Sequence, residues 1–153
     1  MLDLINTENR IEAAIDATNI KAKLIVSPGN LDDRIANPRM ASNIVVRFKN
    51  INYDSKRINP KASCFSRLNT ANFEIIINQN NLRTHEKVYE IAMTCIDALR
   101  GLTVASDENG LIVSNSSPIY ISEFRYRPYD DNKACNKAEI VLSFDYTEVY
   151  SRQ

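Results

Sequence analysis

The residue types that most often perform catalysis are few in this chain and lie far apart. Its 153 residues include one histidine, three cysteines and three glycines. A serine or cysteine nucleophile needs a neighbouring base, so a Ser-His-Asp or Cys-His system would have to use His85. This histidine follows Thr84 at the predicted start of a helix, where the helix dipole disfavours an imidazolium. We therefore expect His85 to be an exposed residue of the first helical turn.

The other reactive residue types also lack a catalytic spacing. No C-x-x-C pair occurs, so we expect three reduced thiols and no zinc or redox motif. The glycines suit turns and caps, not a phosphate-binding loop, and adjacent acids stand in turn-like sequence where they are usually solvated. The sequence therefore predicts no enzyme, no metal site and no cofactor. The cysteines are Cys64, Cys95 and Cys135, and the acidic pairs are Asp32-Asp33, Asp107-Glu108 and Asp130-Asp131.

Charge is unevenly distributed along the chain. The formal net charge is zero, yet segment 34–67 has eight basic residues and one acid, Asp54. Such a cluster neutralises phosphates in nucleic-acid binding, docks on an acidic protein surface, or lies in a solvated loop without a partner. Sparse aromatic residues and the lack of an RRM, KH or helix-turn-helix signature make nucleic acid the weakest of these three interpretations. The basic residues are Arg34, Arg39, Arg47, Lys49, Lys56, Arg57, Lys61 and Arg67.

Hydrophobic periodicity predicts the elements that position these residues. Apolar residues at helical spacing indicate two helices, and alternating or short apolar runs indicate five strands. The polar, basic stretch 50–69 reads as a long loop or arm between two paired strands. We expect an α+β fold, a mostly antiparallel sheet with two main helices packed on one face. The predicted helices span 4–17 and 84–100, and the predicted strands span 23–26, 42–53, 70–79, 117–127 and 138–150.

The second predicted helix is apolar over an unusually wide arc. One stripe contains Val88, Ala92 and Cys95, and a second stripe beside it contains Tyr89, Met93 and Ile96. At ~100° per residue the two stripes cover about 200° of the helical wheel. Two interpretations remain open: a helix deeply buried within its own subunit, or a helix that packs on its own sheet and also on a neighbouring subunit.

Length and composition indicate one soluble domain over 1–153. The apolar fraction of 44% and the charged fraction of 25% are close to globular averages. No apolar run reaches the ~18 residues of a membrane span, and the acidic N-terminus lacks the basic region of a signal peptide. We expect a cytoplasmic location without a membrane partner, or a particle assembled in the cytoplasm.

Four short segments carry a resemblance to a known family. They are 41–48 (ASNIVVRF), 81–85 (NLRTH) opening the long helix, 98–102 (ALRGL) closing it, and 117–120 (SPIY) before the two final strands. In this order the chain, over roughly 40–150, resembles the tail terminator proteins of Mu-like and related contractile-tailed phages and phage-tail-like particles.

The resemblance implies a structural subunit. Members of that family form a homo-hexameric ring on the head-proximal end of the tail tube, stop tube polymerisation, engage the last sheath ring and face the neck or head–tail connector. DNA would be a partner only as it passes through the lumen, and the location would be the virion tail, assembled in the host cytoplasm. Closed rings need two different patches on each subunit, which the basic segment and the wide helical arc could supply. The interface candidates are Arg47, Lys49, Lys56, Arg57, Lys61, Arg67, Tyr89, Met93 and Ile96.

Two alternative functions stay open at this point. One is another head–tail joining or baseplate subunit, which belongs to the same structural class. The other is a nucleic-acid-binding module that uses the basic segment 34–67, for which steep salt dependence of DNA binding would be the signature.

Overall fold

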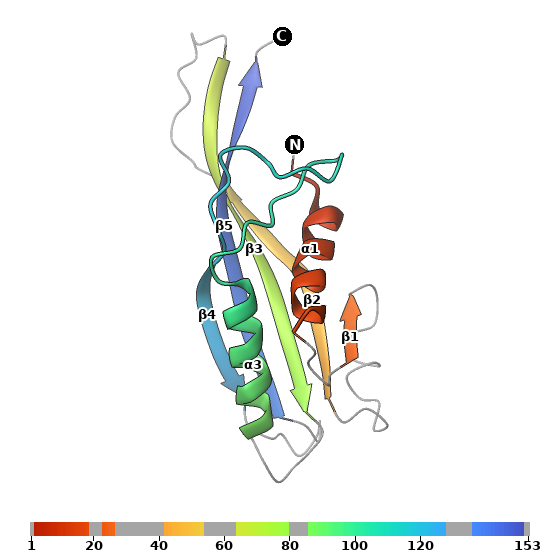
Figure 1. The fold of residues 1–153 in the computed structure, drawn as a ribbon. Coiled ribbons are helices and arrows are strands. Elements are labelled where there is room, and N and C mark those ends of the chain that lie inside the picture. The colour runs from red at the N-terminus through yellow and green to blue at the C-terminus, as the bar shows by residue number, and fades with distance from the viewer. Residues whose placement is uncertain are drawn as a thin grey trace.

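The protein folds as a five-stranded sheet covered on one face by two helices (Figure 1). The computed structural model describes residues 2–18, 23–26, 42–53, 64–79, 86–127 and 136–151. The strand order is β1-β2-β3-β5-β4, with β1 parallel to β2 and every other pair antiparallel. The predicted α+β class is therefore confirmed. The elements are α1 (Leu4–Asp16), β1 (Lys23–Val26), β2 (Ser42–Tyr53), β3 (Cys64–Gln79), α3 (Glu86–Leu99), β4 (Tyr120–Arg127) and β5 (Asn136–Ser151).

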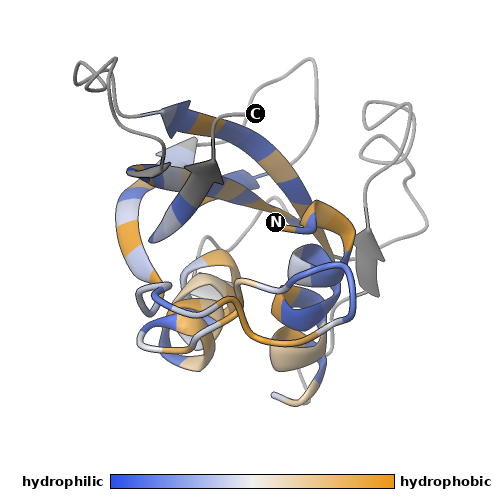
Figure 2. Cartoon of the chain, turned by 90° about the horizontal axis from the view of Figure 1, so that it is seen from above, coloured by the Kyte–Doolittle hydropathy of each residue, from blue (hydrophilic) through white to orange (hydrophobic). Residues whose placement is uncertain are grey.

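Both helices lie on the same side of the sheet (Figure 2) and bury its apolar face. Alternation in β2, β3 and β5 points one set of side chains toward the helices, as the sequence predicted for these strands. Phe73 lies at the centre of this face, with its ring 5.6 Å from Phe48 and 6.0 Å from Phe144 between centroids. The core is therefore a layer of aliphatic side chains with an aromatic row through it. Its members on the sheet include Ile44, Val46, Phe73, Ile75, Ile77, Ile140, Leu142, Phe144 and Tyr146.

The loop predicted over 50–69 overlaps the strand predicted over 42–53, and the structure confirms that strand as β2. The loop prediction is wrong at its other end, because β3 begins at Cys64 and not at residue 70. Within this stretch, 54–63 lies outside the described residues. Polar side chains of this stretch have hydrogen-bond partners within the sheet. Asn50 accepts from the side chain of Asn72 at 2.7 Å, and Asn69 donates to Glu148 at 3.0 Å. The neighbouring strands β3 and β5 supply these partners, which a local propensity argument could not include.

Two β-bulges reset the alternation of side chains. In β2 the register shifts between Phe48 and Asn50, and the Glu8 carboxylate of α1 accepts the Phe48 amide hydrogen at 2.7 Å. In β4 the shift lies between Ile121 and Glu123. A bulge adds one residue to one strand and so reverses the faces beyond it.

The bulge in β4 changes which side chains share a face. Simple alternation would place Tyr120, Ser122, Phe124 and Tyr126 on one face, against the apolar face of β5, with which β4 pairs antiparallel. Phe124 lies opposite Ile140 of the core, whereas Tyr120 lies opposite Ser143 on the face away from the helices. The phenol of Tyr120 contacts Asp145 there at 3.4 Å, which agrees with this reversal.

The ends of the helices follow their sequence signals. Asp3 caps α1, and its carboxylate accepts the Asn6 amide hydrogen at 2.9 Å. Gly101 follows α3 with φ +85°, the left-handed conformation that a glycine after a helix adopts without strain. His85 and Thr84, the predicted opening of the long helix, lie outside the described residues.

Candidate assembly surfaces

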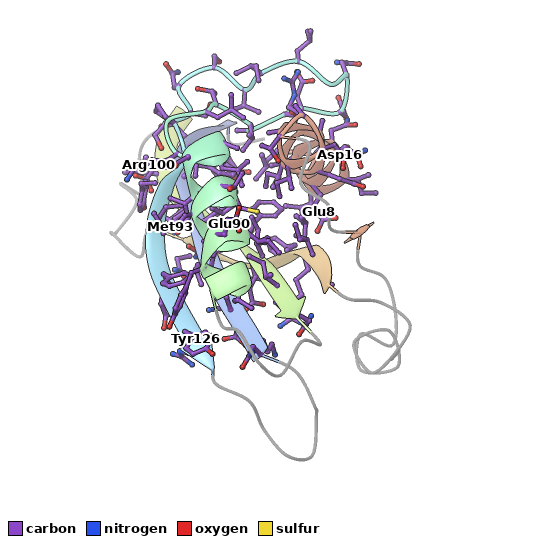
Figure 3. The ribbon with its side chains drawn as sticks, turned by 60° about the horizontal axis from the view of Figure 1, so that its bottom comes forward. Glu8, Asp16, Glu90, Met93, Arg100 and Tyr126 are labelled. Atoms are coloured by element: carbon purple, nitrogen blue, oxygen red, sulfur yellow. The ribbon has the colours of Figure 1, made fainter. Side chains whose placement is uncertain are left out.

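An apolar patch runs along α3 and the edge strand β4. Tyr89 and Met93 lie one helical turn apart and are 38% and 51% exposed. The Tyr89 ring lies 5.0 Å from the ring of Tyr126, and Phe124, two residues away in β4, is 41% exposed. Figure 3 shows Met93 and Tyr126 on the side of α3 that faces β4. We call Tyr89, Met93, Phe124 and Tyr126 the apolar patch.

The wide apolar arc of α3 divides into a buried part and an exposed part. Val88, Ala92 and Cys95 of the first stripe are buried in the core, as predicted. Ile96 of the second stripe is only 7% exposed and belongs to the same core. Its side chain therefore packs within its own subunit, and the exposed part of the arc narrows to Tyr89 and Met93.

The basic interface candidates do not form one surface among the described residues. Arg47 projects from β2, where its Nε lies 2.6 Å from the carboxylate of Glu74 in β3. Arg67 stands in β3 directly opposite Glu148 of β5, on the face of the sheet that bears the helices. Lys49 lies at the bulge of β2. Lys56, Arg57 and Lys61, like Arg34 and Arg39, fall outside the described residues.

The face of the sheet away from the helices carries a depression of balanced charge. Its volume is about 240 Å³. Arg125 lies 2.7 Å from Glu123, and Arg47 pairs with Glu74, so both guanidinium groups already have a carboxylate partner. A phosphate group approaching this depression meets as many acids as bases, which does not favour an anion. Its charged lining residues are Arg47, Lys49, Glu74, Glu123, Arg125 and Glu139.

Helix α1 carries an acidic row on its surface. Glu8, Glu12 and Asp16 follow one another at intervals of four residues, so they lie on one side of the helix. Burial, and then the nearby charges of Asp16 and Glu8, raise the pKa of Glu12 above its ordinary value. Burial also raises the pKa of Glu8, against the opposing effect of its hydrogen bond from Phe48. Ionisation of Glu8 and Glu12 therefore lowers the stability of the folded protein.

Replacing Glu12 by glutamine should stabilise the protein at pH 7. Relief of two like-charge contacts at four-residue spacing predicts a gain of about 0.5 kcal/mol in the free energy of unfolding. Because the pKa of Glu12 is raised in the folded state, the cost is absent below its unfolded value near 4.5 and appears as pH rises through the folded value. Urea unfolding at pH 7 and pH 4 checks this, and an equal gain at both pH values would show that charge is not the cause.

The reactive residue types that the structure describes show no catalytic arrangement. Cys95 is fully buried, and burial raises the pKa of its thiol to about 12, so the thiol stays protonated. Within the described ranges, no cluster of three or more histidine, cysteine and acidic side chains is placed to hold a metal ion. In those same ranges no helix is both long and apolar enough to cross a membrane.

Comparison with known proteins gives a match in fold only. No protein-family model matches the chain, and neither does the sequence of any curated protein. Among solved structures, a chain in the virion of a native gene transfer agent particle is similar over 95% of this chain and 92% of its own length, with 12% identity and a TM-score of 0.58.

A second similar structure comes from PVC, an extracellular contractile injection system. Its sheath/tube terminator in the extended state matches 98% of this chain with 8% identity and a TM-score of 0.58. The match spans 57% of that terminator's length. The protein thus shares its fold with the matched part of a sheath/tube terminator and with a chain of a virion particle.

Sequence reasoning missed two exposed apolar residues that the fold brings to notice. Alternation places Phe124 on the apolar face of its strand, but β4 lies at the edge of the sheet and leaves this ring 41% exposed. Leu68 was assigned to a loop, but it stands in β3 and is 53% exposed. The exposure of Phe124 follows from the strand order, and the exposure of Leu68 follows from the length of β3. Neither feature can be read from local sequence.

Proposed function

We propose that this chain is a tail terminator subunit, which forms a ring on the head-proximal end of a tail tube. The ring stops tube polymerisation and joins tube and sheath to the neck. The observation that carries the proposal is the fold shared with a sheath/tube terminator over 98% of this chain. The resemblance of the sequence to tail terminators, found independently of the fold, supports it.

The surfaces of the subunit suit a role in assembly. Three members of the apolar patch, Tyr89, Met93 and Phe124, are between 38% and 51% exposed on one side of the molecule. Contiguous exposed apolar side chains of this kind are typical of protein–protein interfaces. A closed ring requires each subunit to offer two different surfaces, and the partners of these surfaces would be further copies of the chain, the tube and the sheath. No cofactor and no catalytic step has a part in this function.

Deleting the chain from the genome that encodes the particle tests the proposal. A terminator limits polymerisation, so tail tubes assembled without it should be overlong and variable in length, as measured by electron microscopy. Supplying the wild-type chain from a plasmid should restore the normal length. Tubes of normal length that fail to join heads would instead identify a neck subunit, and absence of tubes would identify a baseplate subunit.

Nucleic-acid binding is the alternative from another class. In the described part of the chain, Arg47 and Arg125 are paired with carboxylates, which weakens their attraction for phosphates. A DNA titration followed by fluorescence anisotropy separates the two functions. Micromolar binding that falls steeply with salt would favour the nucleic-acid module.

A further inference from the structure

We propose that the subunits join head to tail, with a β3–β5 arm of one copy packed on the apolar patch of the next copy. We define the arm as residues 64–68 of β3 and 147–151 of β5. This inference rests on the proposed ring and specifies which two surfaces form the contact between its subunits.

The arm is a two-stranded extension of a wider sheet. It contains the five consecutive pairs from Cys64↔Ser151 to Leu68↔Thr147. Strand β2 stops pairing at Tyr53↔Asn69, and β4 begins at Tyr120↔Ser143, so neither flanks the arm. Figure 1 shows β3 and β5 continuing past the rest of the sheet to one end of the molecule. At ~3.4 Å per residue the arm extends about 17 Å.

An isolated two-stranded ribbon is only marginally stable in water, and the arm lacks the flanking strands that support the rest of β3 and β5. The arm also exposes an apolar side chain, because Leu68 points away from the helix-bearing face and is 53% exposed. On its other face Arg67 lies opposite Glu148, and Asn69 at the root of the arm donates to Glu148 at 3.0 Å. The arm therefore presents one exposed apolar side chain, Leu68, on the face opposite to the one that carries Arg67 and Glu148.

The apolar patch lies at the opposite end of the molecule. The patch consists of residues of helix α3 and strand β4. In Figure 1 the parts of these elements that contain 89–93 and 124–126 lie far from the arm. After the bulge, β4 runs regularly over 123–127. This stretch is five residues long, the same length as the arm. Since β4 is the last strand of the sheet, its outer edge pairs with no strand among the described residues.

The binding partner that suits each surface is another copy of this chain. The arm and the patch lie at opposite ends, so they cannot meet within one subunit, and they differ from one another. A contact between two different patches repeats from copy to copy and closes into a ring when the rotation allows it. A zero net charge adds no overall repulsion between copies. Burying Leu68 against Met93 would remove apolar area of both from water.

Matched glutamate substitutions on exposed apolar residues test this contact. Leu68→Glu alters the arm and Met93→Glu alters the patch, while Leu111→Glu, at a residue 64% exposed on neither surface, is the control. A charge placed in an apolar contact should weaken association at least about tenfold. In sedimentation velocity of the full chain we expect oligomers for wild type and Leu111→Glu, and monomers for the other two variants. Circular dichroism and unfolding midpoints close to wild type would verify that all variants fold.

Mixing the two monomeric variants gives the decisive result. The Met93→Glu copy keeps an intact arm and the Leu68→Glu copy keeps an intact patch, so one contact survives and a one-to-one heterodimer should form. A mixture that stays monomeric, a single variant that assembles like wild type, or a wild-type chain that is monomeric at its highest attainable concentration would overturn the inference. Tube length in the deletion reports separately on the terminator function, so either idea can fail while the other stands.

Discussion

Replacing Phe73 by alanine should lower the free energy of unfolding by about 3–5 kcal/mol. Phe73 is fully buried in the central strand β3, and it lies between Phe48 and Phe144 in the aromatic row. Removing its ring leaves a cavity under both helices that the surrounding strands cannot close. With a total stability of about 5–15 kcal/mol for a typical domain, this is a large fraction. The midpoint of urea unfolding measures the loss.

A matched control for this variant is Phe124→Ala. Phe124 has the same side chain but stands on the edge strand and is 41% exposed, so we expect a loss of about 1 kcal/mol. Phe124 also belongs to the apolar patch, and its substitution should therefore affect assembly more than folding. Equal losses of stability at the two positions would contradict a core centred on β3.

Replacing Thr7 by valine should cost about 1–3 kcal/mol, although the two side chains have the same shape. The hydroxyl of Thr7 donates to the Asp3 carbonyl at 2.6 Å and accepts the Ser106 amide hydrogen at 3.2 Å. Both Thr7 and Ser106 are fully buried, so the valine methyl leaves the Ser106 amide without a partner in a place that water does not reach. Hydrogen exchange at the Ser106 amide should become faster, and urea unfolding should show the loss.

Thr7→Ser separates the hydroxyl from the methyl group. Serine keeps both hydrogen bonds and loses one buried methyl, which costs about 0.8 kcal/mol. The valine variant should therefore be the less stable of the two. The opposite order would mean that packing, and not the buried hydrogen bond, joins α1 to the segment around Ser106.

Much of the fold was predictable because it depends on local patterns. The alternation of Ile140, Leu142 and Phe144 identified a strand with one buried face, and the acidic cap Asp3 and the terminal Gly101 marked helix ends. These signals lie within a few residues of one another, so a single sequence contains them. The same is true of the buried stripe of α3.

Errors arose where a partner distant in sequence decides the structure. The stretch 64–69 looked like part of a loop because it is largely polar, but it pairs with β5 along its whole length, and the side chain of Asn69 donates to Glu148 of that strand. The bulges in β2 and β4 add one residue to a strand, which reverses the faces that simple alternation predicts.

The sequence by itself determined the class of fold, the main helices and strands, and the residues of the long helix that are apolar. The tertiary structure alone decided which of them are available to a partner: it buried Ile96, left Met93 and Phe124 exposed, and extended β3 into the arm that carries Leu68. The reason is physical. Apolar character is a property of each residue, whereas exposure depends on the order of strands in the sheet, and that order is set by contacts between residues far apart in the chain.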